Sequence, residues 1–257
     1  MSFLPVCGNA FGLKTPDGSS EIFALETAGS EVAVALGLLA TLTSFDDALA
    51  SEASLAALCI TDFEYLVLSL RRAWRGPRIA LGLDCGHCRA ASEFSLDIDE
   101  LLRGAIPKAA PGVHPDPDRR GWFTLDGGAF RLPVVGDQIE VAGCARPGRA
   151  LAELCLDEPA RQRPLRRRIE RAMECMAPEI SRVIRGLCPA CAHPIEAYFP
   201  VAATVMAEMR QGAASLHDDV DLIARVYHWP QSEILSLPRE RRRAYVARIR
   251  RALDWAA

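Results

Sequence analysis

The chain has 257 residues, a formal net charge of −3 and a pI of about 6.0, and half of its residues are hydrophobic. This length allows one large domain or two smaller ones with a sizeable core. The acidic balance gives no reason to expect a global attraction to nucleic acid. The nine cysteines are an odd number, which argues against a fully paired disulfide framework.

The sequence indicates a soluble protein of a reducing compartment. No signal peptide is predicted at its start, since no basic segment leads into an apolar core. The longest apolar stretch, Val32–Leu42, has 11 residues and is too short to span a bilayer. In such a compartment a Cys-x-x-Cys pair usually serves metal or redox chemistry.

Residues 1–20 contain several prolines and glycines and are predicted to form an irregular N-terminal arm. Residues 21–257 are predicted to form a single α+β domain. Its parts are an N-terminal half (21–103), an exposed loop (104–121) and a C-terminal half (122–257).

Apolar periodicity and capping residues predict most helices. A helix is expected over 30–42, and another from Ser44, as its N-cap, to about residue 58. The spacing of Thr61 and Glu64 is that of a capping box, which predicts a helix over 61–75. Further helices are expected over 148–156, 164–176, 202–227 with a break near Gly212, 232–236 and 238–255.

Strands are expected around two Cys-x-x-Cys pairs, over 78–84 and 93–98 and again over 183–187 and 195–199. A further hairpin, with strands over 123–125 and 130–135, is predicted by Asp126-Gly127-Gly128.

The two Cys-x-x-Cys pairs are the strongest chemical signal. Cys85 and Cys88 align with Cys188 and Cys191 at a fixed offset of 103 residues, and each pair lies between two short apolar runs. Two such turns supply the four thiolates that a tetrahedral structural Zn²⁺ requires. The predicted fold is therefore α+β and mainly helical, with two zinc-ribbon-like hairpins joined at one metal, although each pair could also hold its own ion.

The alternative is that each pair is a free or reversibly oxidised dithiol. A thioredoxin-like site is disfavoured because neither pair is followed at once by a long helix. His87 and His193 lie beside the turns as reserve ligands or exposed residues, while Cys59 and Cys155 are expected to be small buried residues.

Arginines cluster at 161–171 and 239–251. They suggest either a nucleic-acid surface or, as the second interpretation, a solvated helix face or a face that meets an acidic protein partner. The second interpretation is favoured because the chain is net acidic and because aromatic residues are not interleaved with the arginines, as single-strand binders prefer.

Three segments together resemble the baseplate hub assembly chaperone family of T-even-like phages and related contractile tail-like particles. They are Thr61–Arg72, the Cys188–Cys191 turn with its flanking strands and following helix, and 219–245, which contains Tyr227-His228-Trp229, Glu233-Ile234-Leu235 and Arg242-Arg243-Ala244-Tyr245.

The resemblance implies a non-enzymatic role, as an assembly chaperone or minor structural component, with baseplate or hub proteins as partners and no membrane. The protein would act in the cytoplasm during assembly, or in the baseplate of the particle. We expect Trp229 to lie in a packed corner with Leu222, Val226, Ile234 and Leu235, and Arg241, Arg242 and Arg243 to face an acidic client. The competing hypotheses are a zinc-ribbon nucleic-acid-binding regulator and a Cys-x-x-Cys thiol oxidoreductase.

Overall fold

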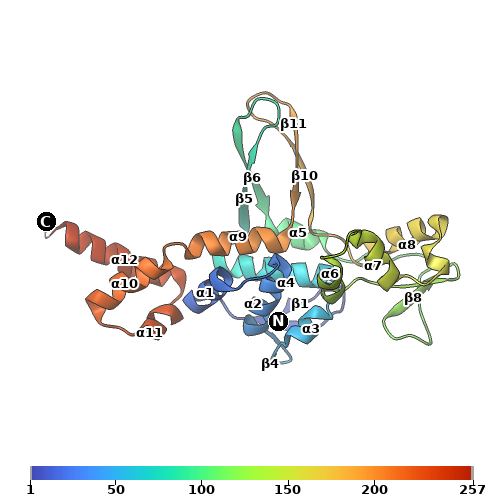
Figure 1. Cartoon of the computed structure of the whole chain (residues 1–257), viewed down its shortest axis with the longest axis horizontal. Coiled ribbons are helices and arrows are strands. Elements are labelled where there is room, and N and C mark those ends of the chain that lie inside the picture. The colour runs from blue at the N-terminus through green and yellow to red at the C-terminus, as the bar shows by residue number, and fades with distance from the viewer. Residues whose placement is uncertain (1, 256–257) are drawn as a thin grey trace.

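The computed structural model describes residues 2–255 and has mixed α+β architecture with small antiparallel sheets. A helical body lies at the centre, two hairpins project from it, and smaller units lie at either end (Figure 1). The strands are β1 (Ser2–Phe3), β2 (Ala10–Leu13), β3 (Thr43–Phe45), β4 (Ala48–Leu49), β5 (Arg78–Asp84), β6 (Ala91–Asp97), β7 (His114–Pro115), β8 (Trp122–Leu125), β9 (Gly128–Arg131), β10 (Arg182–Leu187) and β11 (Pro194–Phe199). The helices are α1 (Gly18–Glu26), α2 (Glu31–Leu42), α3 (Glu52–Ala56), α4 (Ile60–Arg75), α5 (Ile98–Gly104), α6 (Val135–Val141), α7 (Pro147–Cys155), the 3₁₀ turn η1 (Pro159–Arg161), α8 (Arg163–Met176), α9 (Val201–Ala213), α10 (Leu216–Tyr227), α11 (Gln231–Ser236) and α12 (Arg239–Asp254).

Helix α2 is the centre of the body. Ser30 caps it by accepting a hydrogen bond from the Ala33 N–H at 3.3 Å, as its place before the apolar run predicts. Nearly every residue from Val34 to Leu42 is buried, because α1, α4 and α9 pack around the helix. These neighbours keep the apolar residues of α2 away from water, as an apolar helix requires.

The N-terminal residues are not an irregular arm, and this prediction was wrong. Strands β1 and β2 form a sheet with β3 and β4, and Leu4 and Phe11 are buried in the main core. The Asp62 carboxylate accepts hydrogen bonds from the backbone N–H groups of Val6 and Cys7, at 2.8 and 2.9 Å. A buried carboxylate thus holds the connection between β1 and β2 against α4.

The helix predicted from Ser44 is also absent. Residues 43–49 form the β3–β4 hairpin, whose turn residues Asp46 and Asp47 have φ values of 47° and 65°. Aspartate tolerates this left-handed conformation, and pairing of β3 with β2 outweighs the local helical signal. A short helix, α3, begins only after Ser51.

Helix α4 forms as predicted, but not through the expected capping box. It begins at Ile60, and the Thr61 hydroxyl donates to the carbonyl of Pro178 at 3.0 Å. The Glu64 carboxylate accepts hydrogen bonds from the N–H and the hydroxyl of Ser181. Both side chains therefore join α4 to the start of β10.

A second, smaller core lies between the β7–β9 sheet and α8. The predicted hairpin is confirmed, with Asp126 and Gly127 at positive φ in the tight turn between β8 and β9. The second strand ends at Arg131, however, and Val135 begins α6. Much of the 104–121 segment has no regular structure apart from the two-residue strand β7.

Helices α10, α11 and α12 form a separate packed unit at one end of the molecule (Figure 1). Trp229 packs between Tyr227 and Tyr245, with ring centroids 5.2 and 5.1 Å away. Val226 is exposed and Leu235 packs toward α1, so the predicted corner is only partly formed.

Arg242 is not on the surface, and the prediction that it faces a client was wrong. Its side chain is 2% exposed and forms an ion pair with Glu21 of α1, which is 1% exposed. Its Nη1 also donates to the carbonyl of Leu237 at 2.6 Å. This ion pair ties the C-terminal unit to the body.

Replacing Glu21 with Gln should lower the free energy of unfolding by about 3–5 kcal/mol, because Arg242 would remain buried without a countercharge. Chemical denaturation measures this loss. The matched control is Glu240→Gln, at an exposed position on α12, which should change stability by about 0.5 kcal/mol or less. Equal effects of the two substitutions would contradict the importance of the buried pair.

Candidate metal centre

Four cysteine sulfurs meet at the tips of the two projecting hairpins. The Sγ atoms of Cys85, Cys88, Cys188 and Cys191 all lie within 4.8 Å of one another. The Cys85–Cys191 and Cys88–Cys188 distances are both 3.7 Å. The cluster therefore brings together two segments about a hundred residues apart, in an arrangement that could hold one metal ion.

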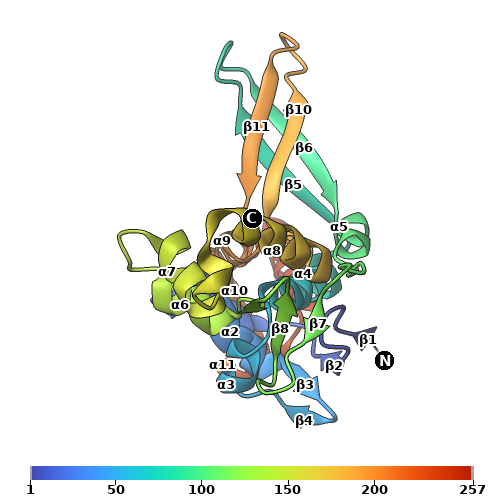
Figure 2. The ribbon, with the colours of Figure 1, turned by 90° about the vertical axis from the view of Figure 1, so that its right-hand side faces the viewer.

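Two antiparallel hairpins carry these sulfurs, and we call strands β5, β6, β10 and β11 together the hairpin arm. The hairpins run side by side away from the body, and their tips lie at the same end (Figure 2). Gly82 pairs with Glu93 in the first hairpin, and Arg185 pairs with Glu196 in the second. The register thus repeats at the offset of 103 residues seen in the sequence.

The backbone turns are also equivalent. The Cys85 N–H donates to the Ala90 carbonyl at 3.0 Å, and the Cys188 N–H donates to the His193 carbonyl at 2.9 Å. The residue after the second cysteine has a φ of 58° at Arg89 and 57° at Ala192. Each turn therefore directs both of its thiols to the same side, toward the other hairpin.

Apolar contacts below the sulfurs hold the hairpins against each other. Cys85 and Cys188 are buried together with Ile195, and Leu83 and Phe94 pack against them. At Gly186 a side chain would approach Phe94 to 2.8 Å, so a residue without a Cβ is needed for this close packing.

The root of the hairpin arm is fixed by buried polar groups. The Ser181 N–H donates to Glu64 at 2.9 Å, and the Ser181 hydroxyl accepts a hydrogen bond from the Val201 N–H at 2.9 Å. Burial raises the pKa of Glu64, although the hydrogen bonds from Ser181 oppose this effect. One serine thus connects α4, β10 and α9.

The thiols of the cluster differ in acidity. Burial disfavours ionisation of Cys188, but the N–H groups of Ala190 and Cys191 outweigh it and lower the pKa of Cys188 to about 6. The His193 N–H favours the Cys191 thiolate, but burial and the neighbouring sulfurs raise the pKa of Cys191 to about 12. Neighbouring thiolates repel one another, and a bound divalent cation would offset this repulsion.

The two histidines beside the turns face each other. The rings of His87 and His193 are stacked, with centroids 4.8 Å apart and planes 20° apart, and both residues are exposed. Neither belongs to the sulfur cluster.

The predicted partner-binding residues differ in their exposure to solvent. Trp229 is half-buried, and Arg241 and Arg243 are exposed on α12, but Arg242 belongs to the core. The Glu21–Arg242 ion pair and the Glu64–Ser181 contact leave no signal in the sequence, because local patterns do not reveal pairings 221 and 117 residues apart.

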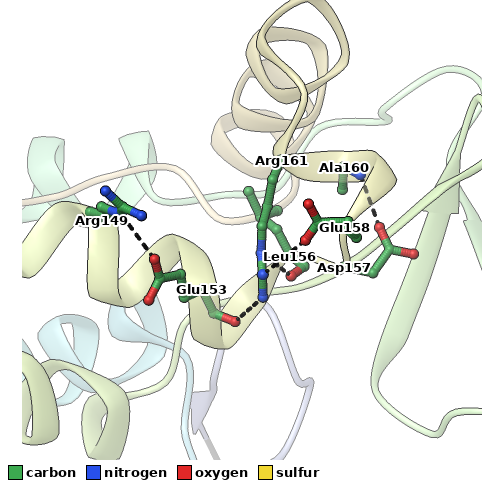
Figure 3. A network of polar contacts seen from close by, with 7 residues as sticks. All are labelled: Arg149, Glu153, Leu156, Asp157, Glu158, Ala160 and Arg161. Carbon is green, nitrogen blue, oxygen red and sulfur yellow. Dashed lines mark hydrogen bonds and ion pairs between the residues drawn. The ribbon is translucent and has the colours of Figure 1, made fainter.

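The first arginine of the 161–171 cluster is engaged in local structure. Arg161 donates to the carbonyls of Glu153 at 2.8 Å and Leu156 at 3.1 Å, at the C-terminal end of α7 (Figure 3). Its guanidinium also pairs with Glu158. A cation at a helix C-terminus satisfies free carbonyl groups, so Arg161 has a structural role here.

Two further arginines of this cluster form ion pairs. Arg166 pairs with Glu170 at 2.7 Å, and Arg168 pairs with Asp126. Arg163 and Arg167 are exposed and form no ion pair within residues 2–255. The positive charge of α8 is thus partly neutralised.

The remaining cysteines are outside the cluster. Cys59 and Cys155 are buried, as predicted. Burial raises the pKa of Cys59 to about 12 and that of Cys155 to about 11, so both are poor nucleophiles. Cys144 is exposed.

Loss of a metal ion held by the four-sulfur cluster should destabilise the fold. A crosslink between residues about 100 apart in sequence is worth roughly 4–5 kcal/mol, so Cys85→Ser, or a strong chelator, should lower the melting temperature by about 10 °C. Differential scanning calorimetry measures the change. Cys144→Ser should have no effect, and a Cys85→Ser protein that melts like the wild type would contradict a bound metal.

None of the helices in residues 2–255 is long and apolar enough to cross a membrane. No protein-family model, curated protein or solved structure matches this chain. Its function must therefore be inferred from its own residues and geometry.

Proposed function

We propose that this protein is a non-enzymatic assembly chaperone or minor structural component of the baseplate or hub of a contractile tail-like particle, stabilised by a four-cysteine Zn²⁺. The observation that carries this proposal is the four-sulfur cluster at the tip of the hairpin arm. Its four sulfurs would fill every coordination position of a tetrahedral zinc ion, and they lie at the end of a projecting element.

The sulfur geometry supports zinc. A tetrahedron of sulfurs at the usual Zn–S distance of about 2.3 Å has edges of about 3.8 Å. Two of the four cross-hairpin Sγ–Sγ distances are 3.7 Å, and all four sulfurs lie within 4.8 Å of one another. Four thiolates leave no coordination position for a substrate, so this zinc would have a structural role.

The position of the cluster supports a role in binding other proteins. A metal at the tip would prevent the two hairpins from separating, while Glu64 and Ser181 fix their root. The hairpin arm would then be rigid over its whole length. A rigid projecting element loses less conformational entropy when it binds a partner than a flexible one does.

The choice of partner comes from the resemblance. Its three segments correspond to α4, to the second hairpin with α9, and to the α10–α12 unit. Helices α4 and α9 pack together in the body, and α10 and α12 pack together in the C-terminal unit. In this proposal, Trp229, Arg241 and Arg243 contact an acidic surface of a baseplate or hub protein.

One observation favours thiol oxidoreductase activity as a second candidate. The four thiols of the cluster are free and lie within 4.8 Å of one another, so a thiolate of one pair could attack a disulfide formed by the other. Bound metal would block such exchange. A protein that is purified without metal and reacts rapidly with a disulfide reagent would favour this candidate over the first.

Charge reversal on the exposed face of α12 tests the proposed partner contact. Arg241→Glu together with Arg243→Glu should reduce assembly of infectious or contractile particles at least about tenfold, because like charges at an interface are repulsive. Particle counts by electron microscopy measure the effect.

The matched control is Arg163→Glu, at an exposed position at the start of α8, where a negative charge favours the helix dipole. Normal particle numbers with the α12 double variant would contradict the proposed contact. Arg242 is omitted, since reversing a buried charge would unfold the protein.

A further inference from the structure

A groove of about 790 Å³ lies beside the N-terminal strands. Strands β1 and β2, helix α4, and helix α5 with the residues that follow it all line this groove, on one side of the body (Figure 2). Pockets that bind ligands in proteins have volumes of about 300–1,000 Å³. The groove is therefore large enough to hold part of another molecule.

The inner surface of the groove is mainly apolar. Leu4 and Phe11 are buried there, and Tyr65 and Leu102 are half-buried. The rings of Tyr65 and Phe11 pack edge to face, with centroids 6.3 Å apart and planes 86° apart. An apolar side chain that enters the groove leaves water for an apolar surface, which is favourable.

Two large apolar side chains that line the groove are exposed to solvent. Phe3 of β1 and Ile106, shortly after α5, are each 58% exposed. Exposed apolar side chains that gather around a groove mark a binding surface, whereas single ones scattered over a protein need no explanation. A molecule bound in the groove would cover both side chains.

Strand β1 provides a further kind of contact. It is the outermost strand of its sheet and pairs only with β2 within residues 2–255. Its other edge therefore has backbone N–H and C=O groups that take no part in the sheet. An extended peptide can pair with such an edge while its alternate side chains enter a neighbouring groove. This contact favours a peptide segment over a small molecule.

The charged side chains of the groove have a positive balance. Arg72 of α4 pairs with Asp99 of α5, with 2.6 Å between Nε and Oδ1. Arg103 also lines the groove, is exposed, and forms no ion pair within residues 2–255. A carboxylate on the bound segment would give Arg103 a partner through a charge-assisted hydrogen bond.

We propose that this groove binds an extended segment of a partner protein that carries apolar side chains and a carboxylate. The apolar side chains lie against Phe3 and Ile106, and the carboxylate pairs with Arg103. The assignment does not depend on the identity of the partner, so it can fail while the baseplate proposal holds, and the reverse.

The exposed apolar end of this chain is a poorer fit for the groove. Leu253 and Trp255, at the C-terminal end of α12, are 56% and 93% exposed. Arginines at positions 248, 250 and 251 give this end of the helix a positive balance. Arg72 and Arg103 repel such an end, so a second copy of the chain is not the expected occupant.

Isothermal titration of the full chain at low ionic strength tests the proposal, with an acetylated and amidated peptide of three Leu-Glu repeats as the probe. The wild-type protein should bind this peptide, because an extended chain of this sequence presents apolar side chains on one face and carboxylates on the other. It should not bind peptides of three Leu-Lys or three Ser-Glu repeats, which lack the carboxylates and the apolar side chains, respectively.

Substitutions at exposed positions separate the apolar and charged contributions. Phe3→Ser and Ile106→Ser should each weaken binding about tenfold, because less apolar area is removed from water. Arg103→Gln should weaken it about threefold, the effect of losing an exposed ion pair. The matched controls are Leu49→Ser, at a 60% exposed position on β4 at the other edge of the same sheet, and Arg163→Gln on α8. Both controls should bind like the wild type.

Asp99→Asn should have the opposite effect. It frees Arg72 and removes a negative charge from the groove, so the Leu-Glu peptide should bind about threefold more tightly. Glu240→Gln, at an exposed position on α12, removes the same charge elsewhere and should leave the affinity unchanged.

Four results would overturn the proposal. The first is the absence of binding of the Leu-Glu peptide to the wild type. The second is equal binding of the Leu-Lys peptide, which would exclude recognition of a carboxylate. The third is weakening by Leu49→Ser equal to that by Phe3→Ser, which would attribute binding to exposed apolar surface in general. The fourth is binding of decanoate, sensitive to Arg103→Gln, without binding of the peptide, which would assign the groove to a small apolar carboxylate.

Discussion

The convergence of four sulfurs is the constraint on which the form of the hairpin arm depends. Each hairpin is a two-stranded sheet, and an isolated two-stranded sheet is at best marginally stable in water. The apolar contact between them is small, centred on Phe94 and Ile195. A shared metal at the tip would supply the crosslink that this contact alone lacks, and it would do so through residues a hundred positions apart.

Two buried polar contacts connect the other parts of the molecule to the central helices. Glu64 and Ser181 join the root of the hairpin arm to α4, and Glu21 and Arg242 join the C-terminal unit to α1. Each contact involves a charge that is costly to bury unless its partner is correctly placed. These pairs therefore specify how the peripheral units attach, while the apolar core around α2 supplies the general stability.

Much of the fold could be predicted where local signals were strong. The cysteine spacing identified the four residues of the cluster and the two hairpins around them, and the periodicity of 61–75 identified α4. The N-terminal strands could not be predicted, because they form only by pairing with β3. Thr61 and Glu64 have the spacing of a cap but bond to Pro178 and Ser181, and this tertiary contact leaves no trace in the local sequence.

The exposure of the arginines, like these tertiary contacts, could not be predicted from the local sequence. Arginines 241, 242 and 243 are consecutive, yet the second is buried while its neighbours are exposed. Arg75 and Arg239 are far apart in sequence, yet in the fold both guanidinium groups lie beside Gly212 of α9. Clusters of charge in a sequence therefore do not define the charged surface of the folded protein.

Native mass spectrometry of the intact chain tests the central claim most directly, since it counts metal ions per molecule and gives their mass. We expect one ion with the mass of zinc, lost in both Cys85→Ser and Cys188→Ser. Two ions per chain, or one ion retained when either hairpin loses its cysteine, would show that the hairpins do not share a metal. A chain free of metal with four reactive thiols at the tip would contradict the account altogether.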